Sequence, residues 1–436
     1  MSGENCFDIL NKIFIPKNNK NINDIKGYSI KYGSIVENDT IIDEVLVSYF
    51  KAPKSYTTEN MCEINSHGGN IIIKKILELC LKNGADLAEP GEFTKRAFLN
   101  GRIDLLQAES VIDVINAKSE REARTGIKQL EGELSKKISE IKKEIMDVMV
   151  NLEVSIDYPE YDVEEVQNTE ICDMLNSIEI KLKKLEKSFD NGKLIKEGIK
   201  TAIIGKPNAG KSSLLNAILK EERAIVTEYE GTTRDTIEEF VNINGIPLKL
   251  IDTAGIRNAK DEIEKIGIER SKEIANSADL IIAIFDSSKE LDEKDNEILE
   301  LIKNKKTIII LNKIDLEQKI NEENKQLKNI TSNIIKLSAL NKIGIEDLFK
   351  KISDLFELNE INIDNEIVIT NLRHKNLISK AIEKVSEVRK TIDNKMPIDV
   401  VAIFLKDILE DLGTITGEYV TENIIDEIFA KFCLGK

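Results

Sequence analysis

The sequence predicts a multidomain protein with α/β and all-α parts, in which an α/β domain is inserted into a helical bundle domain and an α+β domain comes first. Its 436 residues exceed what one hydrophobic core normally holds. Apolar residues recur with helical periodicity on both sides of a central stretch, in which short apolar runs instead alternate with polar loops. We therefore expect four regions, at residues 1–100, 101–197, 198–357 and 358–436.

The first region combines short strands with a helix. Runs of β-type residues at 28–36, 41–50 and 61–65 predict strands, and the apolar spacing at 71–83 predicts a helix. This combination is typical of an α+β domain.

The second and fourth regions are predicted to be helical. Between residues 123 and 145, apolar residues recur at steps of four and three, which predicts one long amphipathic helix. The same pattern repeats between residues 171 and 185. Further helices are expected at 372–388, 397–412 and 420–432.

The third region carries the strands of the α/β domain. Apolar runs predict buried strands, and the run at 237–243 is expected to form a hairpin with the run at 248–251 across the turn Asn244-Gly245. A helix is predicted at 213–219, and the polar residues 317–329 indicate a surface loop or a short helix. The other predicted strands lie at 201–204, 307–311 and 334–337.

A phosphate-binding motif follows the first of these strands. Residues 205–212 fit G-x-x-x-x-G-K-[ST], in which glycines let backbone N–H groups surround the phosphates of a nucleoside triphosphate. Lys211 is expected to reach the β and γ phosphates, and the Ser212 hydroxyl to bind Mg²⁺. The residues expected to contact the nucleotide here are Asn208, Ala209, Gly210, Lys211, Ser212 and Ser213.

A second motif predicts that the base is guanine. Asn312-Lys313-Ile314-Asp315 closes the strand 307–311, and the Asp315 carboxylate can accept hydrogen bonds from N1–H and the 2-amino group of guanine. Adenine offers neither donor and would leave the carboxylate unpaired. Residues Ser338, Ala339 and Leu340 are expected to complete the base site together with Asn312 and Lys313. The nucleotide is therefore predicted to be GTP, and the inserted domain a Ras-like P-loop GTPase domain (G domain).

Two segments between these motifs are expected to sense the γ-phosphate. In Asp252-Thr253-Ala254-Gly255, Asp252 is expected to hold Mg²⁺ through water, and the Gly255 N–H to touch the γ-phosphate. The loop 231–235 is interpreted as the first switch, with Thr233 binding Mg²⁺.

The residue that orients the attacking water is left open by these motifs. Ile256 stands where a Ras-like enzyme carries a glutamine. The candidates are the acidic residues among 261–264 and two arginines, Arg234 and Arg257.

Charge and cysteine usage exclude several classes of protein. The net charge of −16 argues against a broad basic surface for RNA, so any RNA contact is expected to be local or supplied by a partner. The five cysteines show no C-x-x-C pairing, which argues against structural zinc and a disulfide framework. No apolar segment reaches the length of a membrane span and no signal peptide is evident, so we expect a soluble, cytoplasmic protein without membrane contact.

Several of these strings together resemble one family. They are residues 205–213, 231–235, 252–257, 263–270 and 432–436, with Ser66-His67-Gly68-Gly69 and residues 90–100 from the first region. Over almost the whole chain the sequence resembles the MnmE (TrmE) family of tRNA modification GTPases, in the TrmE-Era-EngA-like GTPase superfamily. The resemblance implies a homodimeric GTP hydrolase that works with an FAD-dependent partner, MnmG, in a heterotetramer. Together they add a carboxymethylaminomethyl or aminomethyl group at C5 of the tRNA wobble uridine.

The resemblance also implies site residues. Hydrolysis in the family depends on K⁺, which here would lie among Asn208, Thr227, Tyr229 and Thr232. Glu264 would act on the attacking water, beside the catalytic groups Lys211, Thr233 and Gly255.

A one-carbon folate, such as 5-formyltetrahydrofolate, would be bound by Glu63, Arg102 and Lys436 in the family's arrangement. Cys433 lies in the tail that would reach this folate, which links it to the modification. The alternative for Cys433 is a small buried residue that fixes the C-terminus.

The N-terminus of this chain departs from the family pattern. Family members carry a segment before an Ile-Ser-Gly that forms the first strand and supplies an arginine to the folate, whereas this chain has Met1-Ser2-Gly3 there. We therefore expect weak folate binding and poor dimerisation through the first region.

Two other functions remain open. One is a ribosome-assembly or regulatory switch GTPase without a modification product; such proteins often carry a KH-type RNA-binding module, and none is evident in this sequence. The other is a dimeric scaffold whose GTPase activity controls the assembly of a partner enzyme.

Overall fold

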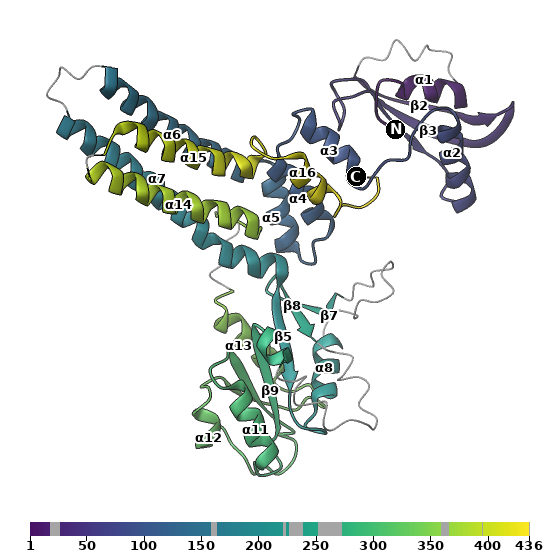
Figure 1. Cartoon of the computed structure of the whole chain (residues 1–436). Coiled ribbons are helices and arrows are strands. Elements are labelled where there is room, and N and C mark those ends of the chain that lie inside the picture. The colour runs from purple at the N-terminus through teal and green to yellow at the C-terminus, as the bar shows by residue number, and fades with distance from the viewer. Residues whose placement is uncertain are drawn as a thin grey trace. The chain divides into compact units, whose positions relative to one another are not determined.

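The computed structural model describes residues 1–17, 27–157, 164–220, 224–225, 239–251, 273–358, 366–394 and 396–435 (Figure 1). The chain divides into two compact units, which we describe separately. Unit 1 contains Met1–Ile112, Lys128–Leu175 and Glu383–Lys436. Unit 2 contains Asp113–Ile127 and Asn176–Ile382.

Unit 1 begins with an antiparallel sheet of order β1-β2-β3-β4. Alternate residues of β3, Val45, Val47 and Tyr49, are buried together with residues of α1 and α2, as expected for a strand with one face against a core. The predicted strands and helix of residues 28–83 are confirmed, whereas α1 and β1 were not predicted. The elements are α1 (Cys6–Ile13), β1 (Phe14–Pro16), β2 (Tyr28–Glu37), β3 (Thr40–Phe50), β4 (Met61–Asn65) and α2 (Asn70–Lys82).

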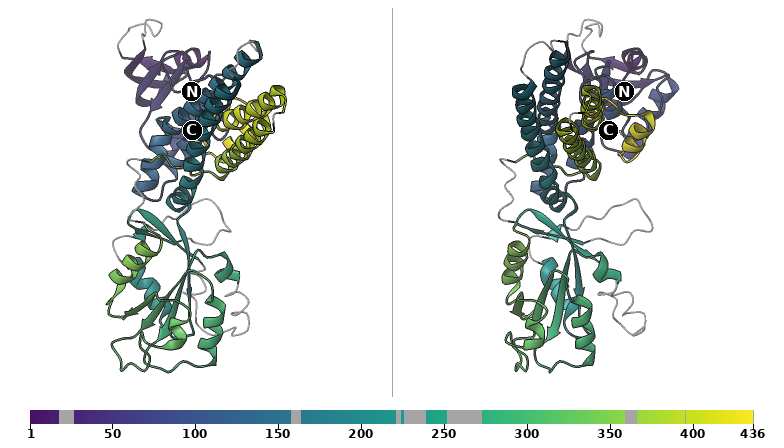
Figure 2. Two further views of the ribbon diagram at one scale, coloured as in Figure 1. Left: turned by 90° about the vertical axis from the view of Figure 1, so that its left-hand side faces the viewer. Right: turned by 60° about the vertical axis from the view of Figure 1, so that its left-hand side comes forward.

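The remaining elements of unit 1 are helical. Helix α6 lies beside α15 (Figure 2), and α16 packs Phe429 against Phe98 of α3. The other helices that lie in or enter this unit are α3 (Glu92–Leu99), α4 (Leu105–Ile115), α5 (Glu120–Leu130), α6 (Glu133–Asp157), α7 (Glu164–Glu197), α14 (Leu372–Asp393), α15 (Ile398–Thr416) and α16 (Glu422–Phe429).

One helix prediction was wrong. The apolar pattern between residues 123 and 145 spans two helices, α5 (Glu120–Leu130) and α6, and not one. Gly132 has a φ of 81° and its N–H donates to the Gln129 carbonyl at 3.0 Å, which ends α5 in a left-handed turn. The apolar steps continue across this break, so periodicity alone did not reveal it.

Unit 2 contains a seven-stranded sheet of order β11-β10-β9-β5-β8-β7-β6. Strands β11, β10, β9, β5 and β8 are parallel, and β7 and β6 are added antiparallel. The strands are β5 (Ile199–Ile204), β6 (Ala224–Ile225), β7 (Glu239–Ile243), β8 (Ile246–Ile251), β9 (Leu280–Asp286), β10 (Thr307–Asn312) and β11 (Ile334–Leu337).

Helices cover both faces of this sheet. Apolar residues of α8 (Lys211–Lys220) and α13 (Ile345–Leu355) share one core with alternate residues of β5, β9 and β10. The other residues of these strands form a second core with α11 (Glu293–Ile302) and the short helix α12 (Lys325–Lys328). The predicted strands are confirmed within the described residues, as are the helix after the P-loop and a short helix within 317–329. Elements β6, β9, α11 and α13 were not predicted.

The sequence order places the α/β domain between helical segments, with α7 before β5 and α14 after α13. The predicted fold class, an α/β domain inserted between helices and preceded by an α+β domain, is therefore confirmed. The four residue boundaries given above stay a proposal.

Candidate functional site

The phosphate-binding loop joins the buried strand β5 to helix α8. Asn208 and Gly210 have φ angles of 64° and 108°, a region that disfavours residues with a Cβ atom. A Cβ atom on Gly205 would lie 2.5 Å from the Ile284 carbonyl oxygen, and one on Gly210 only 2.0 Å from Nδ2 of Asn312. Glycine is therefore required at both positions of the motif.

Lys211 is the first residue of α8 and turns back over this loop. Its ammonium group donates to the carbonyls of Gly205 and Lys206 at 2.7 and 2.8 Å. Burial lowers the pKa of Lys211, because removal from water disfavours the charged form. Ser212 and Ser213 follow it in the first turn and are exposed, where α8 presents backbone N–H groups that suit an anion.

A contact that the sequence did not predict ties the loop to α11. The Lys206 ammonium donates to Asp292 at 2.7 Å and to Asp295 at 2.6 Å, and the Asp295 side chain is buried. Burial lowers the pKa of Lys206, but the hydrogen bonds to the two carboxylates outweigh it, so the pKa is raised. Asp292 and Asp295 also form a capping box at the start of α11. The spacing of Asp292 and Asp295 in the sequence indicates the start of a helix, but it does not indicate that Lys206 binds both carboxylates.

Asn312 connects the phosphate loop to the base motif. Its side-chain N–H donates to the Ala209 carbonyl at 2.8 Å, and its side-chain oxygen accepts from the Ala339 N–H at 3.0 Å. Asn312 is buried, so both hydrogen bonds are shielded from water. The structure thus uses the Asn312 amide to join two loops of the protein, and the predicted contact of Asn312 with the nucleotide stays a prediction.

The predicted base residues come together at the ends of β10 and β11. The Ser338 hydroxyl donates to Oδ1 of Asp315 at 2.6 Å, which fixes one carboxylate oxygen while the side chain stays exposed. Ser338 and Ala339 are buried, and Leu340 is exposed.

Lys313 pairs with the last residue of β9. Its ammonium group donates to Asp286 at 2.6 Å. Burial raises the pKa of Asp286, but hydrogen bonds from Lys313 and Ser288 outweigh it and leave the pKa below its ordinary value. The Asp286 carboxylate is therefore charged at neutral pH.

Several predicted residues lie outside the described residues. They are Thr227, Tyr229, Thr232, Thr233, Asp252, Thr253, Ala254, Gly255, Glu264 and Lys436, with the alternatives at 261–263, Arg234 and Arg257. Their roles stay predictions.

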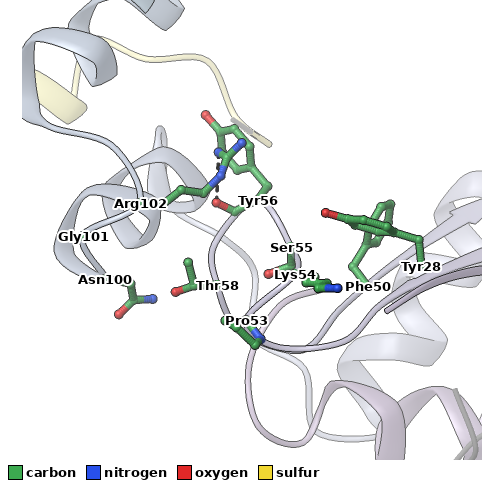
Figure 3. A pocket seen from close by; sticks show the side chains of 10 residues that line it. All are labelled: Tyr28, Phe50, Pro53, Lys54, Ser55, Tyr56, Thr58, Asn100, Gly101 and Arg102. Atoms are coloured by element: carbon green, nitrogen blue, oxygen red, sulfur yellow. Dashed lines mark hydrogen bonds between the residues drawn. The ribbon is translucent and has the colours of Figure 1, made fainter. Parts of the chain in front are cut away.

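Unit 1 contains a separate pocket of about 530 Å³. Figure 3 shows Arg102 and Tyr56 on one side and Tyr28 and Phe50 on the other. The Arg102 guanidinium lies 4.7 Å from the centre of the Tyr56 ring and donates to the Tyr56 carbonyl at 3.2 Å. Ser55 also lines the pocket, and its buried hydroxyl has no hydrogen-bond partner among the described residues.

Glu63, which was also predicted to bind the folate, is not part of this lining. Glu63 is exposed on β4, opposite Ser48 of β3. Cys433 is exposed, so the alternative of a small buried residue is wrong. Its carbonyl accepts from the Gly91 N–H at 3.3 Å, and the neighbouring Leu434 forms a bridge with Pro90. The C-terminal tail thus contacts the loop before α3.

Two features are absent from the described ranges. No helix among them is long and apolar enough to cross a membrane. They also contain no group of three or more His, Cys, Asp or Glu residues arranged to hold a metal ion.

Comparison with known proteins gives consistent matches. A family model described as "MnmE helical domain" matches residues 105–433, and one described as "GTP-binding protein TrmE N-terminus" matches residues 1–102. A protein of Clostridioides difficile named "tRNA modification GTPase MnmE" is 51% identical, over 100% of this chain and 95% of its own length. A protein of Acetivibrio thermocellus with the same name is 49% identical, also over 100% of this chain and 95% of its own length. Among solved structures, the G domain of the T. maritima FeoB iron transporter covers 36% of this chain and 98% of its own, at 28% identity and a TM-score of 0.28.

Proposed function

This chain belongs to the MnmE family of tRNA modification GTPases, and from that premise we propose the reaction in which it takes part. It hydrolyses GTP, with K⁺ as an activating ion, and works with the FAD-dependent protein MnmG. Together they add a carboxymethylaminomethyl or aminomethyl group at C5 of the tRNA wobble uridine. The observation that carries the proposal is the full-length match, combined with a guanine-type site that is joined to the phosphate loop through Asn312.

The described residues account for nucleotide binding. Backbone N–H groups at the start of α8 face the phosphates, and the Lys211 ammonium, now on two loop carbonyls, can exchange them for phosphate oxygens. The Asp315 carboxylate accepts from N1–H and the 2-amino group of guanine, while Ser338 holds one of its oxygens. Adenine cannot satisfy that carboxylate, which supports GTP as the substrate.

The donor set also fits two metal ions. The exposed Ser212 hydroxyl at the start of α8, with Thr233 and with Asp252 through water, would hold Mg²⁺, which neutralises charge on the phosphates. Exposed Asn208, with Thr227, Tyr229 and Thr232, would hold K⁺ near the phosphates. A monovalent cation there supplies the charge that an arginine supplies in other GTPases.

Two groups would act on the reacting atoms. The Gly255 N–H would donate to the γ-phosphate, and Glu264 would orient the attacking water through a second water. Thr233 would close on Mg²⁺ as the first switch orders.

We assign the pocket beside Arg102 to a one-carbon folate such as 5-formyltetrahydrofolate. Aromatic rings from Tyr28, Phe50 and Tyr56 suit a flat ring system, and Lys54 and Arg102 suit its carboxylates. Glu63, which lies outside the pocket lining, and Lys436 would also contribute, and Cys433 is close to Lys436 in the sequence.

The assembly follows from the same proposal. The chain acts as a cytoplasmic homodimer that joins MnmG in a heterotetramer, and tRNA is contacted mostly through that complex. The net charge of −16 supports this division, because a strongly acidic chain is poorly suited to gripping RNA alone.

The test combines hydrolysis with nucleoside analysis. Purified chain should hydrolyse GTP faster in KCl than in NaCl at equal ionic strength, and tRNA from cells that lack it should lose the modified wobble uridine. Intact modification with accumulating ribosomal precursors would instead support a ribosome-assembly GTPase. Intact modification with normal ribosomes, but loss of a partner complex, would support a scaffold.

A further inference from the structure

The turn between β7 and β8 is held by α13. Asn244 and Gly245 have φ angles of 51° and 83°, as in the tight two-residue turns of hairpins. The Asn244 side chain donates to the buried Ser353 hydroxyl of α13 at 2.8 Å. The Gly245 N–H donates to the Asn242 side chain at 2.7 Å. The turn is therefore ordered by its own residues and fixed to a neighbouring helix.

Arg121 of α5 rests directly on this turn. A Cβ atom on Gly245 would lie 2.6 Å from both Cγ and Cδ of Arg121, so only glycine leaves room for the arginine stem. The Arg121 guanidinium donates to the Leu358 carbonyl at 3.2 Å, which fixes its far end. Segment Asp113–Ile127, which contains Arg121, belongs to the same compact unit as the hairpin.

Lys118 makes a second contact with the hairpin. Its ammonium group lies 3.9 Å from the centre of the Phe240 ring, and Phe240 is buried on β7. A cation over an aromatic ring at this distance is attracted by the ring's negative face. We call Lys118 and Arg121, with Phe240 and Gly245 beneath them, the hairpin anchor.

The far ends of the same strands lead to the γ-phosphate motifs. β8 ends at Ile251, and the next residue is Asp252 of Asp-Thr-Ala-Gly. β7 begins at Glu239, shortly after the segment that contains Thr233. A paired strand is stiff along its axis, at about 3.3 Å per residue, so its position at the turn also determines where its other end lies.

From this arrangement we infer that Arg121 and Lys118 are positioning residues for GTP hydrolysis. They hold the hairpin at its turn, and the hairpin in turn sets the position of the strand that continues into Asp252. The rate of hydrolysis therefore depends on a helix that precedes residues 198–357 in sequence. GDP affinity does not depend on the anchor, because the contacts of Lys211, Asn312 and Asp315 do not involve the hairpin. The inference rests on the proposed GTP hydrolysis.

The test is a double-mutant cycle on the full chain, with basal GTP hydrolysis as the readout in Mg²⁺ and K⁺. Gly245→Ala and Arg121→Ala should each lower kcat by about tenfold, since small displacements of reacting groups have effects of this size or larger. GDP affinity should stay within about twofold of wild type. In the Arg121→Ala background, Gly245→Ala should have a smaller effect, because the side chain that its methyl group meets is gone. Arg124→Ala, an exposed arginine of the same helix, is the matched control.

The outcomes separate this inference from the proposed function. An inactive wild-type chain would contradict the proposed hydrolysis itself. An active wild type with unchanged kcat in Arg121→Ala, or with strictly additive effects in the double variant, would overturn the anchor. A matching loss of GDP affinity and kcat would also overturn it, because that pattern indicates local unfolding.

Discussion

Glu122 should make helix α5 less stable as the pH rises through neutrality. It is buried in the first turn of α5, where its carboxylate accepts from the Lys118 N–H at 2.6 Å and its N–H donates to the Ser119 hydroxyl at 3.1 Å. Burial raises the pKa of Glu122 to about 7. The hydrogen bond from the Lys118 backbone N–H and the positive charges of Lys118 and Lys196 act in the opposite direction, whereas the negative charge of Asp113 adds to the increase.

Linkage between protonation and folding determines the direction and the size of this pH effect on stability. The folded protein binds the Glu122 proton more tightly than the unfolded chain, in which the pKa of this carboxyl group is near 4.5. The stabilisation that the bound proton gives to the fold is therefore complete below pH 4.5. It is lost as the pH rises towards 7. At about 1.4 kcal/mol per pKa unit, the loss amounts to about 3 kcal/mol at pH 8.

Hydrogen exchange of the α5 amides provides the assay, because it reports local opening in a chain with several domains. Glu122→Gln keeps an acceptor for the Lys118 N–H and cannot ionise. The variant should match wild type at pH 5 and be more protected at pH 8, by about 2–3 kcal/mol in opening free energy. Glu120→Gln, which changes an exposed carboxylate of the same turn, should show no such trend. A Glu122→Gln effect that does not vary with pH would refute the reasoning.

Three further predictions concern the nucleotide site. Asp315→Asn should weaken GTP and favour xanthosine triphosphate, because one of the paired acceptors becomes a donor; unchanged GTP affinity in a titration would contradict this. Asn208→Ala should remove the difference between hydrolysis rates in K⁺ and Na⁺, and a retained difference would show that the cation is bound elsewhere. Gly210→Ala should abolish GTP binding in calorimetry, because its Cβ atom would lie 2.0 Å from Nδ2 of Asn312, and near-normal affinity would mean that the loop can move aside.

The elements that could be predicted from the sequence are those that a local pattern of residues encodes. Strands such as β10 and β11 are apolar runs, and the P-loop is a contiguous motif, so each could be recognised from a few neighbouring residues. β9 is also a continuous apolar run, Leu280–Asp286, and could have been predicted in the same way. The break at Gly132 could not be located from periodicity, because the apolar steps continue through it.

Contacts between distant residues could not be predicted in this way. Lys206 pairs with Asp292 and Asp295, which are close only because β5 and β9 are neighbours in the sheet. Arg121 and Gly245 are likewise far apart in sequence, and each looks ordinary in its own segment. Such partners depend on the assembled fold, and local sequence patterns do not reveal them.

The Asn312 amide has a consequence for how a ligand is received. Because one side chain joins the Ala209 carbonyl to the Ala339 N–H, the P-loop and the loop after β11, which is predicted to face the base, share a common support. The conformational entropy of bringing these loops together is lost when the chain folds and is not lost again when the nucleotide arrives. The two halves of the site are preorganised with respect to each other, so a disturbance of either loop reaches the other through a single buried amide.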